Sequence, residues 1–212
     1  MSPPPIPVPT PLARQALVLA ALWGLAAPAV AGTVQVRVLG ATGQPLPQAA
    51  VLLEPAGDAR AAVKPATAVE IVQQGRRFVP ELTVVPVGTA VHFPNMDTVR
   101  HHVYSFSPAK RFELKLYAGR PEHPVVFDRP GIVVLGCNIH DQMVGWVVVA
   151  DTPWHGRTDA AGTVTLDAVP PGRYTLRAWH PALAPGAALP EQAVTVGAGP
   201  LELSVPLGVA AR

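Results

Sequence analysis

The chain has 212 residues, a formal net charge of +2 at pH 7 and a charged fraction of 14%. This length fits one or two small domains with an adequate core, and it excludes large repeat arrays. The near-neutral charge, without a basic patch that carries interleaved aromatic residues, argues against nucleic-acid binding.

Residues 1–31 have the pattern of a secretory signal peptide. Arg14 precedes an apolar run over residues 16–27, and the small residues Ala29 and Ala31 frame a cleavage pattern before Gly32. The apolar run is too short to span a hydrocarbon core, which needs about 20 residues. We therefore expect export to the periplasm, cleavage after Ala31 and no stable membrane insertion after cleavage.

Residues 32–60 are predicted to hold the first strands of a small β-sandwich. Residues 33–39 alternate apolar and polar side chains, as a half-buried strand does, and residues 49–54 form a second apolar segment after a Gly and Pro turn. Residues 55–65 are rich in Ala, Gly and Pro and are predicted to be a linker. A lone pair of strands is marginal in water, so these strands need partners elsewhere.

Residues 66–150 are predicted to form an all-β sandwich, because short apolar segments alternate with Gly and Pro turns and no useful helical periodicity occurs. The predicted strands lie at residues 69–72, 82–85, 90–93, 112–117, 125–127, 132–135 and 147–149, with a further strand that starts at His101. The segments 132–135 and 147–149 are continuously apolar, which predicts strands buried deep in the core.

The loop between these two apolar segments carries the chemistry. It contains the only cysteine, Cys137, followed by His140 and Met143. A thiolate, an imidazole and a thioether suit a soft or borderline metal ion, and copper fits better than zinc because a thioether is a poor zinc ligand. The usual second imidazole is expected from a neighbouring strand, where His101 and His102 are both candidates.

Other roles for Cys137 are less favourable. A single cysteine in an exported chain makes no intramolecular disulfide, so it is a free thiol, an intermolecular partner or a metal ligand. A Cys and His nucleophile would need an oxyanion site and a third orienting residue, and neither is evident. We therefore expect a metal-binding protein and not an enzyme.

The middle of the chain resembles the cupredoxin (type 1 blue copper) family over roughly residues 66–150. The residues that carry the resemblance are the segment 84–95, then Asp97, His101 and Val103, then Asp128, Pro130 and Gly131, and finally Cys137, His140 and Met143. The loop spacing is similar to that of amicyanin, and residues 101–117 resemble periplasmic cupredoxin-like proteins labelled methylamine utilization proteins.

This resemblance implies a Greek-key sandwich with one type 1 copper ion. Its ligands would be His101, Cys137 and His140, with Met143 as the weak axial ligand and the exposed edge of His140 as the exit for electrons. The choice of His101 comes from the family motif, because strand alternation alone leaves His101 and His102 open. Many members have an Asn after the upstream His that hydrogen-bonds to the ligand loop; His102 stands there in this chain, and its imidazole could make the same bridge.

The two ends of the chain resemble a second family, the carboxypeptidase regulatory-like β-sandwich. Residues 32–60 resemble its first strands, and residues 151–212 resemble its remainder. One interpretation is a sandwich split in sequence, with residues 66–150 inserted between its second and third strands. The alternative is an N-terminal hairpin and a C-terminal domain in series. Trp154 and Trp179 are expected to pack this second sandwich, and Trp146 is expected to support the core or the loop.

These observations predict a periplasmic, monomeric carrier of single electrons between redox partner proteins of the dehydrogenase or cytochrome c class. A copper chaperone or store would use the same ligands but would exchange its metal ion. A third alternative is a binding module whose second sandwich recognises a partner or a polysaccharide, with copper vestigial.

Overall fold

The computed structural model describes Met1 and residues 31–57, 61–184, 186–187 and 189–210. Within these residues the chain has 17 strands and no α-helix, which confirms the predicted all-β class. The described part also contains no helix that is long and apolar enough to cross a membrane. The expected signal peptide, apart from Met1 and Ala31, and residues 58–60 of the expected linker lie outside the described residues.

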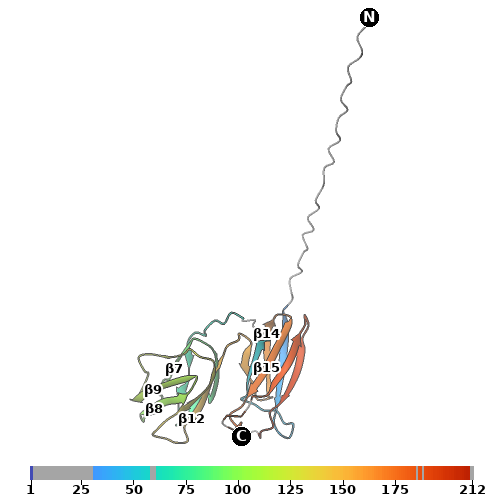
Figure 1. The fold of residues 1–212 in the computed structure, drawn as a ribbon. Helices are drawn as coiled ribbons and strands as arrows, with labels where there is room; N and C mark the ends of the chain where they lie inside the picture. The colour runs from blue at the N-terminus through green and yellow to red at the C-terminus, as the bar shows by residue number, and fades with distance from the viewer. Residues whose placement is uncertain (2–30, 58–60, 185, 188, 211–212) are drawn as a thin grey trace.

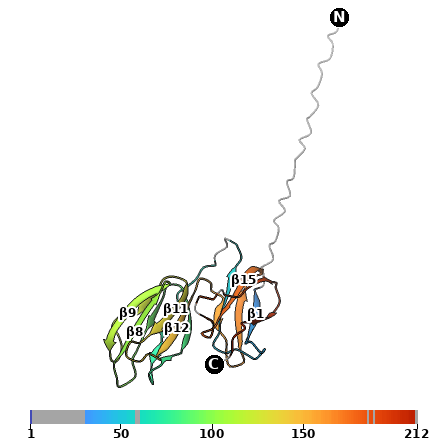
Figure 2. The same cartoon turned by 60° about the horizontal axis from the view of Figure 1, so that its bottom comes forward.

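Two β-sandwiches lie side by side in both views of the chain (Figures 1 and 2). We call them the terminal sandwich, built from β1, β2 and β13 to β17, and the middle sandwich, built from β3 to β12. The strands of the terminal sandwich are β1 (Gly32–Leu39), β2 (Ala50–Pro55), β13 (His155–Arg157), β14 (Thr163–Val169), β15 (Gly172–Trp179), β16 (Glu191–Val196) and β17 (Leu201–Pro206).

In the terminal sandwich, the two N-terminal strands are surrounded by strands from the other end of the chain. β1 lies between β14 and β17, and β2 lies between β13 and β15, with β16 beyond β15. Alternate residues of β1 are buried, as predicted for a half-buried strand, with Val34, Val36 and Val38 fully inaccessible to solvent. The Tyr174 hydroxyl donates to the Pro170 carbonyl at 2.8 Å, which ties β15 to the preceding turn.

The middle sandwich has its own sheets and its own core. One sheet has the order β6-β12-β11-β8-β9, a second has β10-β7-β3, and β4 pairs with β5. Its strands are β3 (Val69–Glu70), β4 (Val72–Gln73), β5 (Phe78–Val79), β6 (Leu82–Pro86), β7 (Thr89–His92), β8 (His101–Ser107), β9 (Lys110–Tyr117), β10 (Val125–Phe127), β11 (Gly131–Gly136) and β12 (Val144–Ala150). The chain thus leaves the terminal sandwich after β2 and returns to it at β13. The domain boundaries near residues 60, 66 and 150 stay predictions.

Two of the predicted strands differ from the structure. The predicted strand 69–72 is divided into β3 and β4, which belong to different sheets on either side of the fully buried Ile71. The segment 132–135 was expected to be continuously buried, but β11 alternates, and Val134 is 45% exposed. By contrast, Val147 to Ala150 of β12 are all buried, as predicted.

The difference between β11 and β12 follows from what covers the sheet. One face of β12 packs into the core of the middle sandwich through Val147 and Val149. The other face packs against the terminal sandwich, where Val148 and Leu82 share a cluster with Ala50. On β11, Ile132 packs against this cluster, whereas Val134 lies two residues nearer the ligand loop and remains open to solvent.

Candidate metal centre

The ligand loop, residues 137–143, is held at both ends by sheet. β11 pairs with β12 at every residue from Gly131 to Gly136, and the last pair, Gly136 with Val144, closes the loop. Within the loop, the Met143 amide donates to the His140 carbonyl at 2.8 Å. A short loop closed in this way keeps its side chains in a fixed arrangement.

His101 comes to this loop because β8 runs antiparallel to β11. Tyr104 pairs with Gly136, so the start of β8 lies beside the residues that follow β11. Gly136 is needed here, because a Cβ at this position would lie 2.7 Å from the Tyr104 ring. The sheet register therefore delivers His101 to the ligand loop from a distant part of the sequence.

The structure brings three of the predicted ligands together. The donor atoms of His101, Cys137 and His140 all lie within 4.8 Å of one another, the only such group of three or more His, Cys, Asp or Glu residues in the described part of the chain. The Cys137 Sγ and His101 Nδ1 atoms are 4.0 Å apart, and the two imidazole rings meet edge to face with centroids 5.1 Å apart. His101 is fully buried and Cys137 is 3% exposed, whereas His140 is partly open to solvent.

These residues fit a copper ion. With the bond lengths of zinc sites, about 2.0 Å to nitrogen and 2.3 Å to sulfur, two donors on one ion lie at most about 4.3 Å apart, and Sγ and Nδ1 satisfy that limit for a metal ion of this size. The His140 Nδ1 atom is buried and has no hydrogen-bond partner, which is unfavourable unless another group binds it. One thiolate with two imidazoles is the donor set of mononuclear copper sites in electron-transfer proteins.

Met143 is 1% exposed and belongs to the same buried cluster as Cys137. It is the last loop residue, directly before β12 begins. The structure thus places the thioether in the core beneath the loop, and its axial role stays a prediction.

His102 does not bridge to the ligand loop as we considered from the sequence. Its Nε2 atom lies 2.8 Å from Glu113 Oε1 on β9, and its ring packs against Tyr104 with centroids 5.5 Å apart. The two histidines lie on opposite faces of β8: Val103 and Ser105 are buried on the face of His101, whereas Tyr104 and the exposed Phe106 share the face of His102. His101 therefore faces Cys137, while His102 lies against β9.

Asp97 is the functional residue that sequence reasoning did not assign a role. Its Oδ2 atom lies 2.7 Å from His101 Nε2, and its two oxygens accept hydrogen bonds from the amides of Gly75 and Arg76 at 2.7 and 2.9 Å. Burial raises the pKa of Asp97, but the hydrogen bonds from Arg76, His101 and Gly75 outweigh it and hold the pKa below its ordinary value. An ionised carboxylate only accepts, so Nε2 of His101 donates to Asp97, and Nδ1 is the ring nitrogen that faces Cys137 Sγ.

Asn95 fixes the turn that leads to His101. It is 4% exposed, its Nδ2 atom donates to the carbonyls of Val99 and Tyr117 at 2.9 and 3.0 Å, and its Oδ1 accepts from the Asp97 amide at 2.9 Å. The backbone around Asp97 is therefore tied to β9. Asn95 and Asp97 are both part of the family pattern found in the sequence, but that pattern does not show their hydrogen-bond partners.

No protein-family model and no curated protein sequence matches the chain. Among solved structures, a purple cupredoxin from Nitrosopumilus maritimus is 26% identical, with 39% of this chain and 99% of that chain covered and a TM-score of 0.35. A copper-containing nitrite reductase from Thermus scotoductus is 26% identical over 45% of this chain and 25% of that chain, with a TM-score of 0.37. A reduced amicyanin variant is 20% identical over 48% of this chain and 98% of that chain, with a TM-score of 0.34. At these TM-scores the similarity does not by itself assign the chain to a family.

Proposed function

We propose that the chain is a type 1 copper protein that carries single electrons between redox partner proteins in the periplasm. The observation that carries this proposal is the buried group of one thiol and two imidazoles, with donor atoms within 4.8 Å of one another. When bound there, copper would supply a one-electron couple between Cu(I) and Cu(II). We propose no chemical transformation of a substrate.

The four proposed ligands would have different roles in binding the copper ion. Cys137 would bind as thiolate, and the imidazoles of His101 and His140 would complete the strong donor set. Met143 would be the weak axial ligand. The paired strands β11 and β12 keep three of these four residues on one rigid loop, which favours electron transfer without rearrangement of the ligands.

The exposure of the ligands supports a route for electrons through His140. His101, Cys137 and Met143 are all at most 3% exposed, so the partly exposed His140 is the ligand that a partner protein can approach. Its neighbour Ile139 is 52% exposed and offers an apolar contact surface at the same place. We propose that this face docks a redox partner of the dehydrogenase or cytochrome c class, and that the carrier acts as a monomer.

The finer assignments rest on sequence patterns. The motif spacing supports a cupredoxin of the periplasmic methylamine utilization type for the middle sandwich. The Gly and Pro turn between β1 and β2 and the segment of β14 and β15 support a carboxypeptidase regulatory-like terminal sandwich. The pattern of residues 1–31 supports export to the periplasm.

A Cu(II) titration of the metal-free protein tests the proposal. We expect one equivalent of Cu(II) to give an intense visible thiolate-to-copper band, because Cys137 would bind as a short thiolate in a trigonal site. The Cys137→Ser variant should lack this band while its far-ultraviolet circular dichroism stays that of a β protein. A stoichiometric but colourless Cu(II) complex of the unmodified protein would overturn the type 1 assignment.

A further inference from the structure

A turn distant in sequence from every predicted ligand is connected to the metal centre through Asp97. The turn spans residues 74–77 and joins β4 to β5. The amides of Gly75 and Arg76 donate to the Asp97 carboxylate at 2.7 and 2.9 Å, and that carboxylate lies 2.7 Å from His101 Nε2. The turn is thus one side chain away from a proposed copper ligand.

The geometry of this turn is unusual for its sequence. Gln74 and Arg77 exchange hydrogen bonds between their amides and carbonyls at 3.0 and 3.2 Å, which closes a two-residue hairpin loop. Both central residues have positive φ, 62° at Gly75 and 57° at Arg76. Glycine adopts this conformation freely, but arginine does so only at a steric cost, so the surroundings must favour it at Arg76.

Asp97 is the group that favours it. Consecutive residues in such a conformation can direct successive N–H groups to one side, where they form a concave site for an anion. Here the two amides bind the two oxygens of one carboxylate, one each. The carboxylate is thereby fixed in position, and only its third hydrogen bond is directed to His101.

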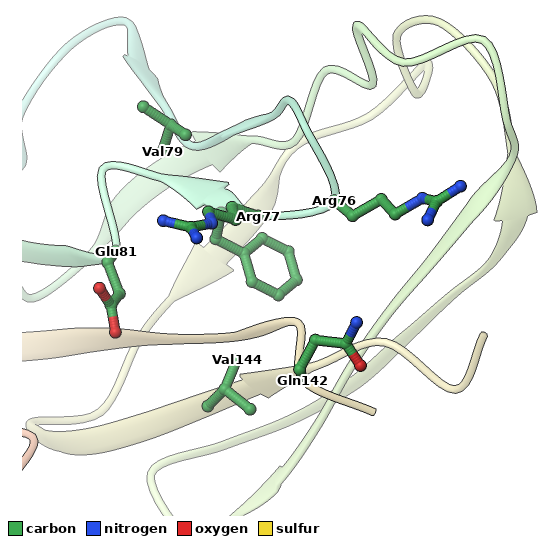
Figure 3. Close-up of a pocket in the computed structure, with 7 residues that line it drawn as sticks. Arg76, Arg77, Val79, Glu81, Gln142 and Val144 are labelled. Carbon is green, nitrogen blue, oxygen red and sulfur yellow. The ribbon is translucent and has the colours of Figure 1, made fainter. Parts of the chain in front are cut away.

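The turn is also anchored beside the ligand loop. Phe78, which follows it, lies over Gly145 so closely that a Cβ at residue 145 would be 2.9 Å from the Phe78 Cβ. One cavity of about 410 Å³ is lined both by the turn, through Arg76 and Arg77, and by the ligand loop, through Gln142 (Figure 3). The hairpin is therefore braced against β12 on one side and against Asp97 on the other.

We propose that the turn at residues 74–77 is a positioning element of the metal centre. It holds the Asp97 carboxylate, the carboxylate holds the Nε2 proton of His101, and the ring then presents Nδ1 to Cys137 Sγ. Asp97 and Gly75 act through His101 and do not touch the metal ion. This inference rests on the proposed copper site, but its first consequence, the fixed His101 ring, exists in the metal-free protein.

The Gly75→Val variant tests the turn without touching its neighbours. No atom lies within 4 Å of a Cβ built at Gly75, so valine acts only through the backbone, where a β-branched residue opposes positive φ. Gly43→Val is the matched control, because Gly43 has a φ of 80° and equally open surroundings but lies in a turn of the terminal sandwich. Arg76→Gly is the conservative variant, because glycine keeps the turn and removes only the side chain.

Two measurements follow the effect. In the metal-free protein, ¹⁵N NMR should show a single His101 tautomer for the parent, Gly43→Val and Arg76→Gly, and mixed tautomers for Gly75→Val and Asp97→Asn. In competition titrations, Gly75→Val and Asp97→Asn should bind Cu(II) about 10 to 100 times more weakly than the parent. A loss of this size is typical when the hydrogen-bond partner of a metal ligand is removed.

The outcomes separate this inference from the proposed function. A folded Gly75→Val protein with the parent's tautomer and copper affinity would overturn the positioning role, as would an equal loss in Gly43→Val. If the parent binds no copper but Gly75→Val still releases the His101 ring, the proposed function fails and the positioning of His101 by the turn stands.

Discussion

The indole rings of Trp146 and Trp179 lie 6.3 Å apart between centroids, and the two residues belong to different sandwiches. They flank a small buried cluster formed by Ala50 of the terminal sandwich with Leu82 and Val148 of the middle sandwich. The Arg157 guanidinium adds a hydrogen bond across the same boundary, 2.9 Å from the Leu82 carbonyl. The sheet that carries the ligand loop is therefore supported on its outer face by the rest of the chain.

Replacing Trp179 by Ala should weaken this contact between the sandwiches. Trp179 is only partly buried, so we expect a loss of about 2 kcal/mol in the free energy of unfolding, below the 3–5 kcal/mol that is typical of fully buried aromatic residues. Denaturant unfolding, followed separately for each sandwich, measures this loss in the free energy of unfolding. Trp154→Ala is the control, because Trp154 packs against Tyr174 within the terminal sandwich and should destabilise that sandwich alone. An unchanged middle sandwich in Trp179→Ala would contradict mutual support.

Truncation after Ala150 should leave β1 and β2 without their partners. β1 pairs with β14 and β17, and β2 pairs with β13 and β15, all of which would be removed. A two-strand remnant does not bury its apolar face, so its amides should exchange rapidly and proteases should cut it. Residues 66–150 alone should still fold and bind copper. Full amide protection of β1 and β2 in the truncated chain would indicate two domains in series.

The sequence predicted the strands where side-chain alternation is set by a single core, and failed where packing depends on distant segments. Residues 33–39 face one core and alternate as expected. The burial of Val148 and the exposure of Val134 depend instead on which part of the sheet the terminal sandwich covers, and an apolar run alone carries no such information. The sequence likewise places Trp179 in the terminal sandwich but does not show that its ring packs at the boundary.

The His101→Ala variant should lose the blue copper site, whereas His102→Ala should keep it. His101 Nδ1 lies 4.0 Å from Cys137 Sγ, while the hydrogen bond of His102 goes to Glu113, whose side chain is 57% exposed. We expect His101→Ala to bind Cu(II) more than about 100 times more weakly than the unmodified protein. This loss is larger than the 10-fold to 100-fold loss that is typical when only a hydrogen-bond partner of a ligand is removed. His102→Ala should lower the free energy of unfolding by about 1 to 3 kcal/mol, because it removes a buried ring. Visible and electron paramagnetic resonance spectra compare them, and the reverse result would move the ligand by one residue.

Replacing Met143 by Leu should raise the reduction potential and keep the colour. Leucine preserves the volume of this buried side chain, so the change in fold stability should stay below about 1.5 kcal/mol. Loss of a weak axial donor destabilises Cu(II) more than Cu(I), because the more highly charged ion is stabilised more by an additional donor. Protein-film voltammetry gives the potential. Loss of the metal ion from Met143→Leu would show that the thioether is a structural ligand and not a tuning one.

The candidate site was predictable as far as its residues are neighbours in sequence. Cys137, His140 and Met143 stand on one loop, and their spacing indicates a shared metal ion without knowledge of the fold. The choice between His101 and His102 came from a family motif, since alternation along β8 puts the two side chains on opposite faces but does not show which face meets the ligand loop. The link from Gly75 through Asp97 to His101 depends on a turn conformation at an arginine, which no residue preference suggests.

The last prediction separates an electron carrier from a copper store. A carrier holds both oxidation states on one ligand set, whereas a store must release Cu(I) to a competitor. Three of the proposed ligands lie on a loop closed by the Gly136 and Val144 pair, and His101 is fully buried and held by Asp97, so we expect retention of the metal ion. The reduced, copper-loaded protein should therefore lose little Cu(I) to a moderate chelator while it exchanges electrons quickly with a small redox protein. Asp97→Asn serves as the comparison, because it frees the His101 ring and should speed the loss of Cu(I). Rapid loss of Cu(I) from the unmodified protein, together with slow electron exchange, would favour copper handling over electron transfer.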